Sequence, residues 1–177
     1  MREAEPSAQS ACPGPANGQG HAEDLGLPEP FRIGAFEGSV SEWLQRCRWQ
    51  FDTIVDGHIV VEGRPVFCHG DRESAFWHLV TSSRGDGARE LNPRRCEIVG
   101  QVWELLERFA DGDPRVKAWR QKHRDGTNAI AVAPPDFSLV VALRRCRSTM
   151  LLVTAYPVTR LGRRARLAER ALLEVAA

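Results

Sequence analysis

With 177 residues, 42% of them hydrophobic and 27% charged, the chain has the size and balance of one globular domain with a packed core, which excludes a wholly disordered protein. No apolar run approaches the roughly 20 residues that span a bilayer, and the N-terminus lacks the apolar centre of a signal peptide. We therefore expect a cytoplasmic protein with no membrane partner. The five cysteines are widely spaced and form no C-x-x-C pair, which argues against a disulfide framework or a structural zinc site.

Charge is distributed unevenly, although the net charge is only +1. Residues 1–90 carry 8 Arg and Lys against 14 Asp and Glu, whereas residues 91–177 carry 16 against 9. Only Lys117 and Lys122 are lysines, and arginine is the cation that binds phosphate through two parallel hydrogen bonds. The basic C-terminal half is therefore compatible with a polyanionic partner without requiring one.

The N-terminal segment and the first elements follow from composition and periodicity. Residues 1–28 are rich in Pro, Gly, Ala, Ser and Glu and predict a disordered tail, so that a single domain occupies residues 29–177 and order begins near "PFRIGAF". "SVSEWLQRCRWQFDTIV" (39–55) has apolar residues at helical spacing, with Ser39 or Ser41 as the N-cap. "HIVVEGRPVFCHG" (58–70) predicts a hairpin, and "SAFWHLVTS" (74–82) is an apolar run of unassigned type.

The second half predicts a helix, three strands and a last helix. "NPRRCEIVGQVWELLERFAD" (92–111) reads as one helix, with Asn92 as N-cap and Pro93 at the first helical position. "NAIAVA", "DFSLVVALRR" and "TMLLVTAYPV" predict an antiparallel meander, and the segment around Trp119 before them stays unassigned. "LGRRARLAERALLEVA" predicts a basic amphipathic helix. The expected fold class is α+β, with N-terminal helices packed on a small antiparallel sheet and a C-terminal amphipathic helix.

The third strand raises a question about polar groups in an apolar run. "LLVTAYPV" (151–158) contains the only tyrosine of the chain. Strict alternation along a strand places Leu152, Thr154 and Tyr156 on one face. Two explanations stay open: an edge of the core where both polar groups meet solvent, or the floor of a site that handles a phosphate or a sugar.

One histidine and four arginines are candidates for chemistry. His78 lies inside "FWHLVTS", and imidazole transfers protons near neutral pH, although a histidine in an apolar run is more often a hydrogen-bonded core residue. Arg94 and Arg95 fall in the first turn of the helix at 92–111, where a phosphate can be shared with free backbone N–H groups. Arg144 ends the middle strand of the meander, and Arg160 follows the last strand. The alternative is that Arg94 and Arg95 are solvated surface residues and that Arg144 and Arg160 merely border turns.

No sequence motif for a metal or a nucleotide is present. The chain lacks a Walker-type loop, G-x-G-x-x-G, H-E-x-x-H and G-x-S-x-G, and its carboxylates do not cluster. An enzyme of this sequence is therefore expected to use no metal and no cofactor.

The series "FWHLVTS", "NPRRCEIV", a tryptophan, "DFSLVVALRR" and "MLLVTAYPV" resembles, in this order, phage- and plasmid-associated domains of the barnase/EndoU/colicin/RelE-like (BECR) nuclease superfamily. The resemblance covers about residues 36–175. It implies a helical front half with a four-stranded antiparallel sheet and a metal-independent ribonuclease, often a toxin. It also implies RNA, including tRNA, as substrate, and an antitoxin or immunity protein as partner.

The same resemblance implies a set of site residues, whose individual roles we infer from chemistry. His78 serves as base or acid, Tyr156 donates to the leaving group or stacks on a base, and Thr154 orients the phosphate. Arg94 or Arg95 holds the phosphate with the helix N-terminus. The expected catalytic residues are His78, Tyr156, Thr154 and Arg95. The expected substrate-binding residues are Arg94 and Thr81, to which the positions at the strand ends add Arg144 and Arg160.

Two other functions remain open from the sequence. A basic sheet face and a basic last helix suit a non-catalytic module that binds RNA or an acidic protein, because phosphate contacts do not require a proton-transfer pair. The other is a housekeeping α+β domain in which His78 and Tyr156 are ordinary residues at the edge of the core.

Overall fold

The computed structural model describes residues 25–54, 59–68, 70–83, 85, 87–122 and 126–175. Most of the predicted N-terminal tail, residues 1–24, lies outside the described residues. Leu25, within the last part of that predicted tail, is 3% exposed and belongs to the main core. Packing therefore begins before the expected start near "PFRIGAF".

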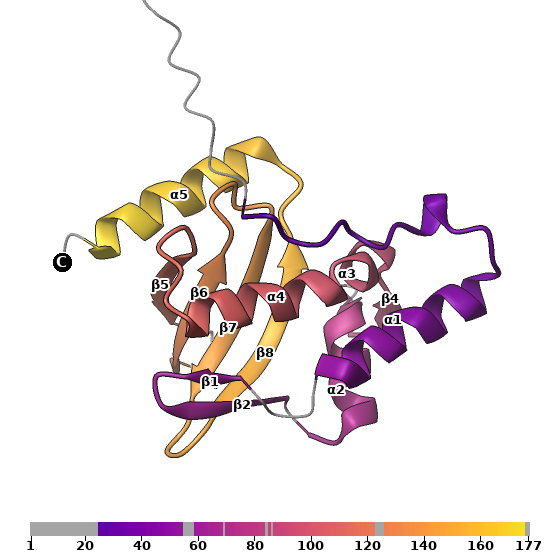
Figure 1. Cartoon of the computed structure of the whole chain (residues 1–177), viewed down its shortest axis with the longest axis horizontal. Helices are drawn as coiled ribbons and strands as arrows, with labels where there is room; N and C mark the ends of the chain where they lie inside the picture. Colours follow the sequence, from indigo (N-terminus) through magenta and orange to yellow (C-terminus); the bar gives the residue numbers. More distant parts are fainter. Residues whose placement is uncertain are drawn as a thin grey trace, which may run out of the picture.

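The fold is α+β, as the sequence predicts, and a curled six-stranded sheet and a small two-stranded sheet organise it (Figure 1). In chain order the elements are η1 (Ile33–Ala35), α1 (Val40–Ile54), β1 (Val60–Val61), β2 (Arg64–Cys68), α2 (Arg72–Val80), β3 (Thr81–Ser83), β4 (Arg89–Leu91), α3 (Pro93–Glu97), α4 (Val99–Ala110), β5 (Lys117–Lys122), β6 (Asn128–Ala133), β7 (Leu139–Arg145), β8 (Met150–Pro157) and α5 (Leu161–Val175).

The large sheet has the strand order β1-β2-β8-β7-β6-β5. The predicted meander is confirmed as β6, β7 and β8, and the predicted hairpin as β1 and β2. The expectation of a small, wholly antiparallel sheet is wrong, because β2 pairs with β8 in parallel and β5 adds a sixth strand. The helices and turns between β2 and β8 are long enough to bring the two strands side by side in the same direction.

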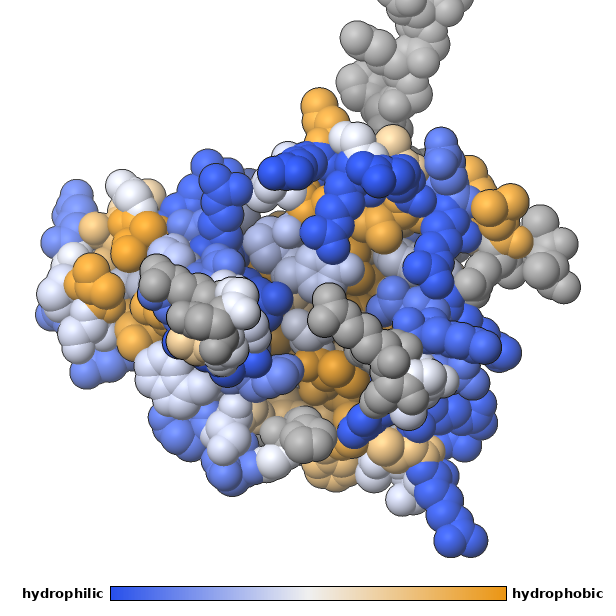
Figure 2. Space-filling model, turned by 180° about the vertical axis from the view of Figure 1, so that it is seen from behind, coloured by the Kyte–Doolittle hydropathy of each residue, from blue (hydrophilic) through white to orange (hydrophobic). Residues whose placement is uncertain are grey.

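The two faces of the large sheet are covered differently. α4 lies across the front face (Figure 1), where an apolar core joins it to β7, β8 and the N-terminal helices. α5 packs on the back face through Leu167 and Ala171, which share one apolar cluster with Trp119, Val140 and Tyr156. Figure 2 looks onto this back face, where hydrophilic side chains lie close to exposed apolar surface.

The predicted helix over residues 92–111 is two helices, α3 and α4, separated at Ile98. The carbonyl of Glu97 accepts the N–H of Phe31 at 2.9 Å, and its carboxylate accepts the N–H of Ile33 at 3.1 Å. Ile98 has φ −95° and ψ 0°, so the chain turns there before α4 begins. A contact from a distant segment therefore divides a run that is helical by local pattern.

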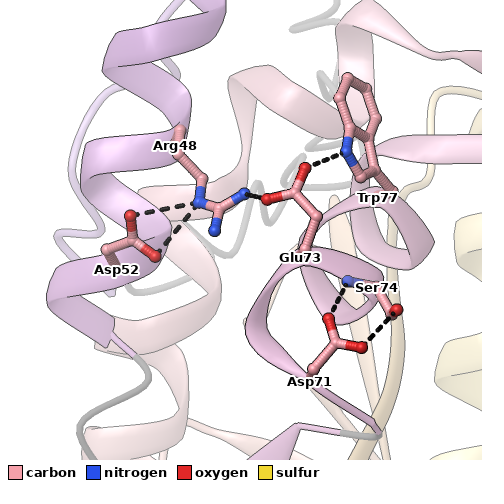
Figure 3. Close-up of polar contacts among 6 residues, drawn as sticks. All are labelled: Arg48, Asp52, Asp71, Glu73, Ser74 and Trp77. Carbon is pink, nitrogen blue, oxygen red and sulfur yellow. Dashed lines mark hydrogen bonds and ion pairs between the residues drawn. The ribbon is translucent and has the colours of Figure 1, made fainter.

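The apolar run "SAFWHLVTS" forms the second half of α2 and the start of β3. Asp71 caps α2 by accepting the N–H of Ser74 at 2.8 Å. A polar network ties α2 to α1 (Figure 3): Arg48 donates to Asp52 on its own helix and to Glu73 on α2, and Glu73 also accepts the indole N–H of Trp77. This network sets the position of α2, whose last turn carries His78.

The described cysteines are free thiols, as the sequence predicts. Cys47 of α1 and Cys96 of α3 are both fully buried in the main core. Burial raises the pKa of Cys68 to about 11, so this thiol stays protonated and unreactive near neutral pH.

Candidate functional site

A bulge in β8 decides which of its side chains face the back of the sheet. Ala142 pairs with Thr154 and Leu143 pairs with Leu152, so Val153 is an extra residue in β8. Leu152 and Ala155 both reach the front core, whereas Thr154 and Tyr156 lie on the back. The predicted shared face of Thr154 and Tyr156 is confirmed, but Leu152 does not share it.

Arg95 is the side chain that connects β8 to the end of α2. Its Nη1 donates to the Thr81 carbonyl at 3.0 Å, to the Leu79 carbonyl at 3.4 Å and to Thr154 Oγ1 at 3.5 Å. All three contacts use Nη1. Nε and Nη2 make no hydrogen bond to the described residues, and a guanidinium edge of this kind matches two phosphate oxygens.

A second arginine, Arg89 of β4, lies on the same helix end. Its Nε donates to Thr81 Oγ1 at 2.8 Å, and its Nη2 donates to the carbonyls of His78 at 2.9 Å and Thr81 at 3.2 Å. Thr81 is buried, and its hydroxyl donates to the Trp77 carbonyl. Thr81 therefore accepts hydrogen bonds from both guanidinium groups and holds them against the last turn of α2, where cations stabilise the helix.

The hypothesis that Arg94 and Arg95 share a phosphate with a helix N-terminus is not supported. α3 has only five residues, and the N–H groups of Arg95 and Cys96 already donate to the Asn92 carbonyl. The Asn92 side chain does not cap α3 and points to Ser82 instead, at 3.4 Å. Arg95 thus turns away from its own helix end toward the carboxyl end of α2.

Tyr156 lies beyond Thr154 on the same face, at the edge of the surface that α5 covers. The guanidinium of Arg163, in the first turn of α5, stands 5.0 Å from the centre of its ring. Tyr156 also interacts electrostatically with Arg95. The phenol ring therefore lies against an arginine of α5, and an arginine of α3 is near enough to interact with it electrostatically.

Electrostatically, this part of the site is a cluster of positive charge. Burial lowers the pKa of the Arg95 guanidinium, the charge of Arg89 lowers it further, and Tyr156 opposes the shift. The partners of Arg89 and Arg95 within the described ranges are carbonyls and hydroxyls, with no carboxylate among them. An anion bound here relieves the repulsion between the two guanidinium groups.

His78 and Arg144 form a second part of the site. They line a cleft of about 250 Å³ together with Ser74 and Val153, and the imidazole is exposed at the last turn of α2. The expectation that a histidine in an apolar run is buried is therefore wrong here. Val153 of this lining directly precedes Thr154, which accepts a hydrogen bond from Arg95.

The remaining two candidates lie apart from these contacts. Arg94 and Arg160 are both exposed, and the Arg160 carbonyl accepts the N–H groups of Arg163 and Arg164 at the start of α5. The structure thus brings Arg95, Thr81, Thr154 and Tyr156 together, and it adds His78 and Arg144 through the neighbouring cleft.

Two site residues escaped the sequence reasoning. Arg89 lies in "RGDGARELN", which reads as a polar loop, and only its pairing as β4 beside β3 directs it at Thr81. Arg163 belongs to a helix that appeared merely basic and amphipathic. Its position seven residues after Tyr156, across a short turn, is the one signal that the chain offers for this contact.

Comparisons with known proteins add no relative: no family model matches the chain, and neither the curated proteins nor the solved structures contain a significant match. Within the residues that the structure describes, no three His, Cys, Asp or Glu side chains come together as metal ligands. None of the helices in those same residues is long and apolar enough to cross a membrane.

Proposed function

We propose that the protein is a metal-independent endoribonuclease of the BECR type, which cleaves RNA by attack of a 2′-hydroxyl on the adjacent phosphate. The observation that carries the proposal is the cluster in which Arg95 contacts Thr154 and Thr81 beside Arg89 and Tyr156. It holds two guanidinium groups beside Thr154 of β8, and the preceding residue, Val153, lines a cleft that also contains the exposed His78. Both features suit a phosphate that must be bound and then attacked.

The chemical steps divide between the two parts of the site. His78 removes the proton of the 2′-hydroxyl, and the 2′-oxygen attacks phosphorus. Arg95, with Thr154 beside it, stabilises the negative charge that develops on the phosphoryl oxygens. Tyr156 donates a proton to the 5′-oxygen as its bond to phosphorus breaks. The products are a 2′,3′-cyclic phosphate and a free 5′-hydroxyl. The His78 imidazolium then releases its proton to solvent, and the Tyr156 phenolate regains one from solvent.

The biological setting belongs to the same proposal. A ribonuclease of this kind works on cellular RNA in the cytoplasm, with tRNA among its substrates. Such an activity harms the cell that makes it unless a partner blocks the site. The cluster of positive charge suits an acidic antitoxin or immunity protein, because complementary charge speeds and directs association.

The test is an incubation of purified protein with total RNA and with tRNA in excess EDTA, beside the variant His78→Ala. We expect discrete fragments with 2′,3′-cyclic phosphate ends from the wild type and intact RNA from the variant. Gln45→Ala, an exposed position on α1, serves as the matched control and is expected to cleave normally. Equal cleavage by His78→Ala contradicts the mechanism, and intact RNA in every lane contradicts the activity.

A second candidate function is a non-catalytic RNA-binding module. It is favoured by the contacts of Arg89 and Arg95 with the carbonyls of α2, which stabilise a helix end whether or not any reaction follows. Binding that weakens steeply with salt, without product formation at any protein concentration, would identify this function.

A further inference from the structure

A row of side chains crosses the back face of the sheet at the end that is remote from Tyr156. Phe67 of β2 pairs with Leu151 of β8, and Leu151 pairs with Arg144 of β7. Residues that pair across neighbouring strands point to the same face, so these three side chains stand in line. Their order across the sheet is an aromatic ring, an aliphatic spacer and a cation.

Phe67 has a large apolar side chain, and yet the residue is 44% exposed to solvent. Its neighbour Val66 is buried in the front core, so alternation along β2 directs the Phe67 ring to the back. The contacts of α5 with the back face involve Trp119, Val140 and Tyr156, at the other end of the strands. Figure 2 shows apolar surface beside hydrophilic side chains on this face.

The row adjoins the cleft described above. Arg144 lines that cleft with His78 and Val153, and it is two strand spacings, or about 10 Å, from Phe67. An arginine side chain is long enough to shorten this backbone separation by several ångströms. An aromatic ring and a guanidinium group at such a distance match the base and the phosphate of a nucleotide.

We propose that Phe67 and Arg144 form a subsite for one unpaired nucleotide, with the base stacked on the Phe67 ring and the phosphate at Arg144. The proposal rests on the proposed ribonuclease function and specifies its substrate class: single-stranded RNA that lies along β8 from Phe67 toward Tyr156. The next phosphate along the strand then reaches Arg95 and Thr154 at the reacting position.

The aromatic platform is what excludes a duplex. In an A-form helix the bases are stacked on one another and their faces are closed to a side chain, whereas an unpaired base can stack on an exposed ring. Phosphate contacts alone do not discriminate in this way, since duplex and single strand both carry phosphates. The exposed ring beside the cation therefore predicts a preference for unpaired RNA.

The experiment measures binding of the full-length protein to an RNA that cannot be cleaved. The probe is a fluorescein-labelled 12-nucleotide RNA with every 2′-hydroxyl methylated, used alone and annealed to its complement. We expect tighter binding of the single strand, a loss of about 5- to 100-fold for Phe67→Ala, and near wild-type binding for Phe67→Trp. Val60→Ala, a 49% exposed apolar residue in the adjacent strand β1, is the matched control and should bind normally.

The outcomes separate this inference from the proposed activity. Three results overturn the subsite. The wild type and Phe67→Ala bind the single strand equally well, the wild type binds the duplex as tightly as the single strand, or the wild type binds neither RNA. Selective weakening by Phe67→Ala in a protein that cleaves no natural RNA retains the subsite and rejects the nuclease. Normal cleavage of natural RNA by the wild type, together with unchanged RNA binding by Phe67→Ala, retains the nuclease and rejects the subsite.

Discussion

The two faces of the large sheet differ in what their residues do. The front face is covered by α4, and the side chains between them, such as Val102, Leu105 and Leu106, are almost completely buried. The back face is covered by α5 at one end only, and beyond it lie an exposed phenylalanine, partly exposed arginines and the cleft beside His78. The front core is therefore the larger of the two, and the back face, packed under α5 at one end, leaves Phe67 exposed at the other.

This comparison predicts that substitutions on the two faces affect different measurements. The largest effect is expected from Tyr156→Phe, which removes one hydroxyl and keeps the ring that packs under Arg163. Loss of a general acid lowers the rate of RNA cleavage by about 10²- to 10⁴-fold. The free energy of unfolding should change by less than about 0.5 kcal/mol. Cleavage at the wild-type rate would remove Tyr156 from the reaction.

A core truncation on the front face should show the opposite behaviour. Leu106→Ala removes a fully buried side chain of α4 and is expected to reduce the free energy of unfolding by about 2–5 kcal/mol. Leu172→Ala, on α5 with the leucine 71% exposed, should change it by less than about 0.5 kcal/mol. Urea denaturation of both variants measures this difference, and similar losses would show that α5 packs more deeply than the structure indicates.

Arg95 connects the two behaviours, because it stabilises α2 and faces the proposed phosphate site. Arg95→Ala leaves the carbonyls of Leu79 and Thr81 without one donor and should cost about 1–3 kcal/mol of stability. Arg94→Ala changes the neighbouring exposed arginine and provides the control, with an expected change below about 0.5 kcal/mol. If thermal unfolding shows equal changes for the two variants, the contacts of Arg95 with α2 contribute no stability.

The smallest effect concerns the front-face helix and is visible only in acid. Hydrogen bonds from Arg115 lower the pKa of Asp113, just after α4, to about 2. Because the folded pKa lies below the unfolded one, the carboxylate stabilises the fold above about pH 4, and this contribution disappears as the pH falls toward 2. Unfolding at pH 5 and at pH 2.5 should therefore show wild type losing more stability than Asp113→Asn. Parallel losses in both proteins would contradict the assignment.

The strong periodic segments of the fold were predictable from the sequence. α1, the β1–β2 hairpin, the β6–β7–β8 meander and α5 follow the expected patterns because their apolar residues recur at one clear period. β5 was not predicted, since "KAWRQK" has a single large apolar side chain, and its strand conformation depends on pairing with β6. Likewise β4 exists through its pairing with β3.

The candidate site was only partly predictable. The sequence pointed to Thr154, Tyr156 and Arg95, and these side chains do lie together. It assigned Arg95 to the wrong helix end, because the break at Ile98 and the approach of α2 are not local properties. It gave no reason to select Arg89, and only the short separation in sequence from Tyr156 pointed to Arg163.

The sequence by itself determined the α+β class, the order of the main elements and the polar residues in "LLVTAYPV", because each depends on composition or periodicity over a few residues. Only the tertiary structure decided the parallel pairing of β2 with β8, the bulge at Val153 and the meeting of two arginines on the end of α2. These features arise from contacts between different elements of the fold. The free energy of such contacts depends on which segments pack together, and the local sequence pattern does not predict that packing.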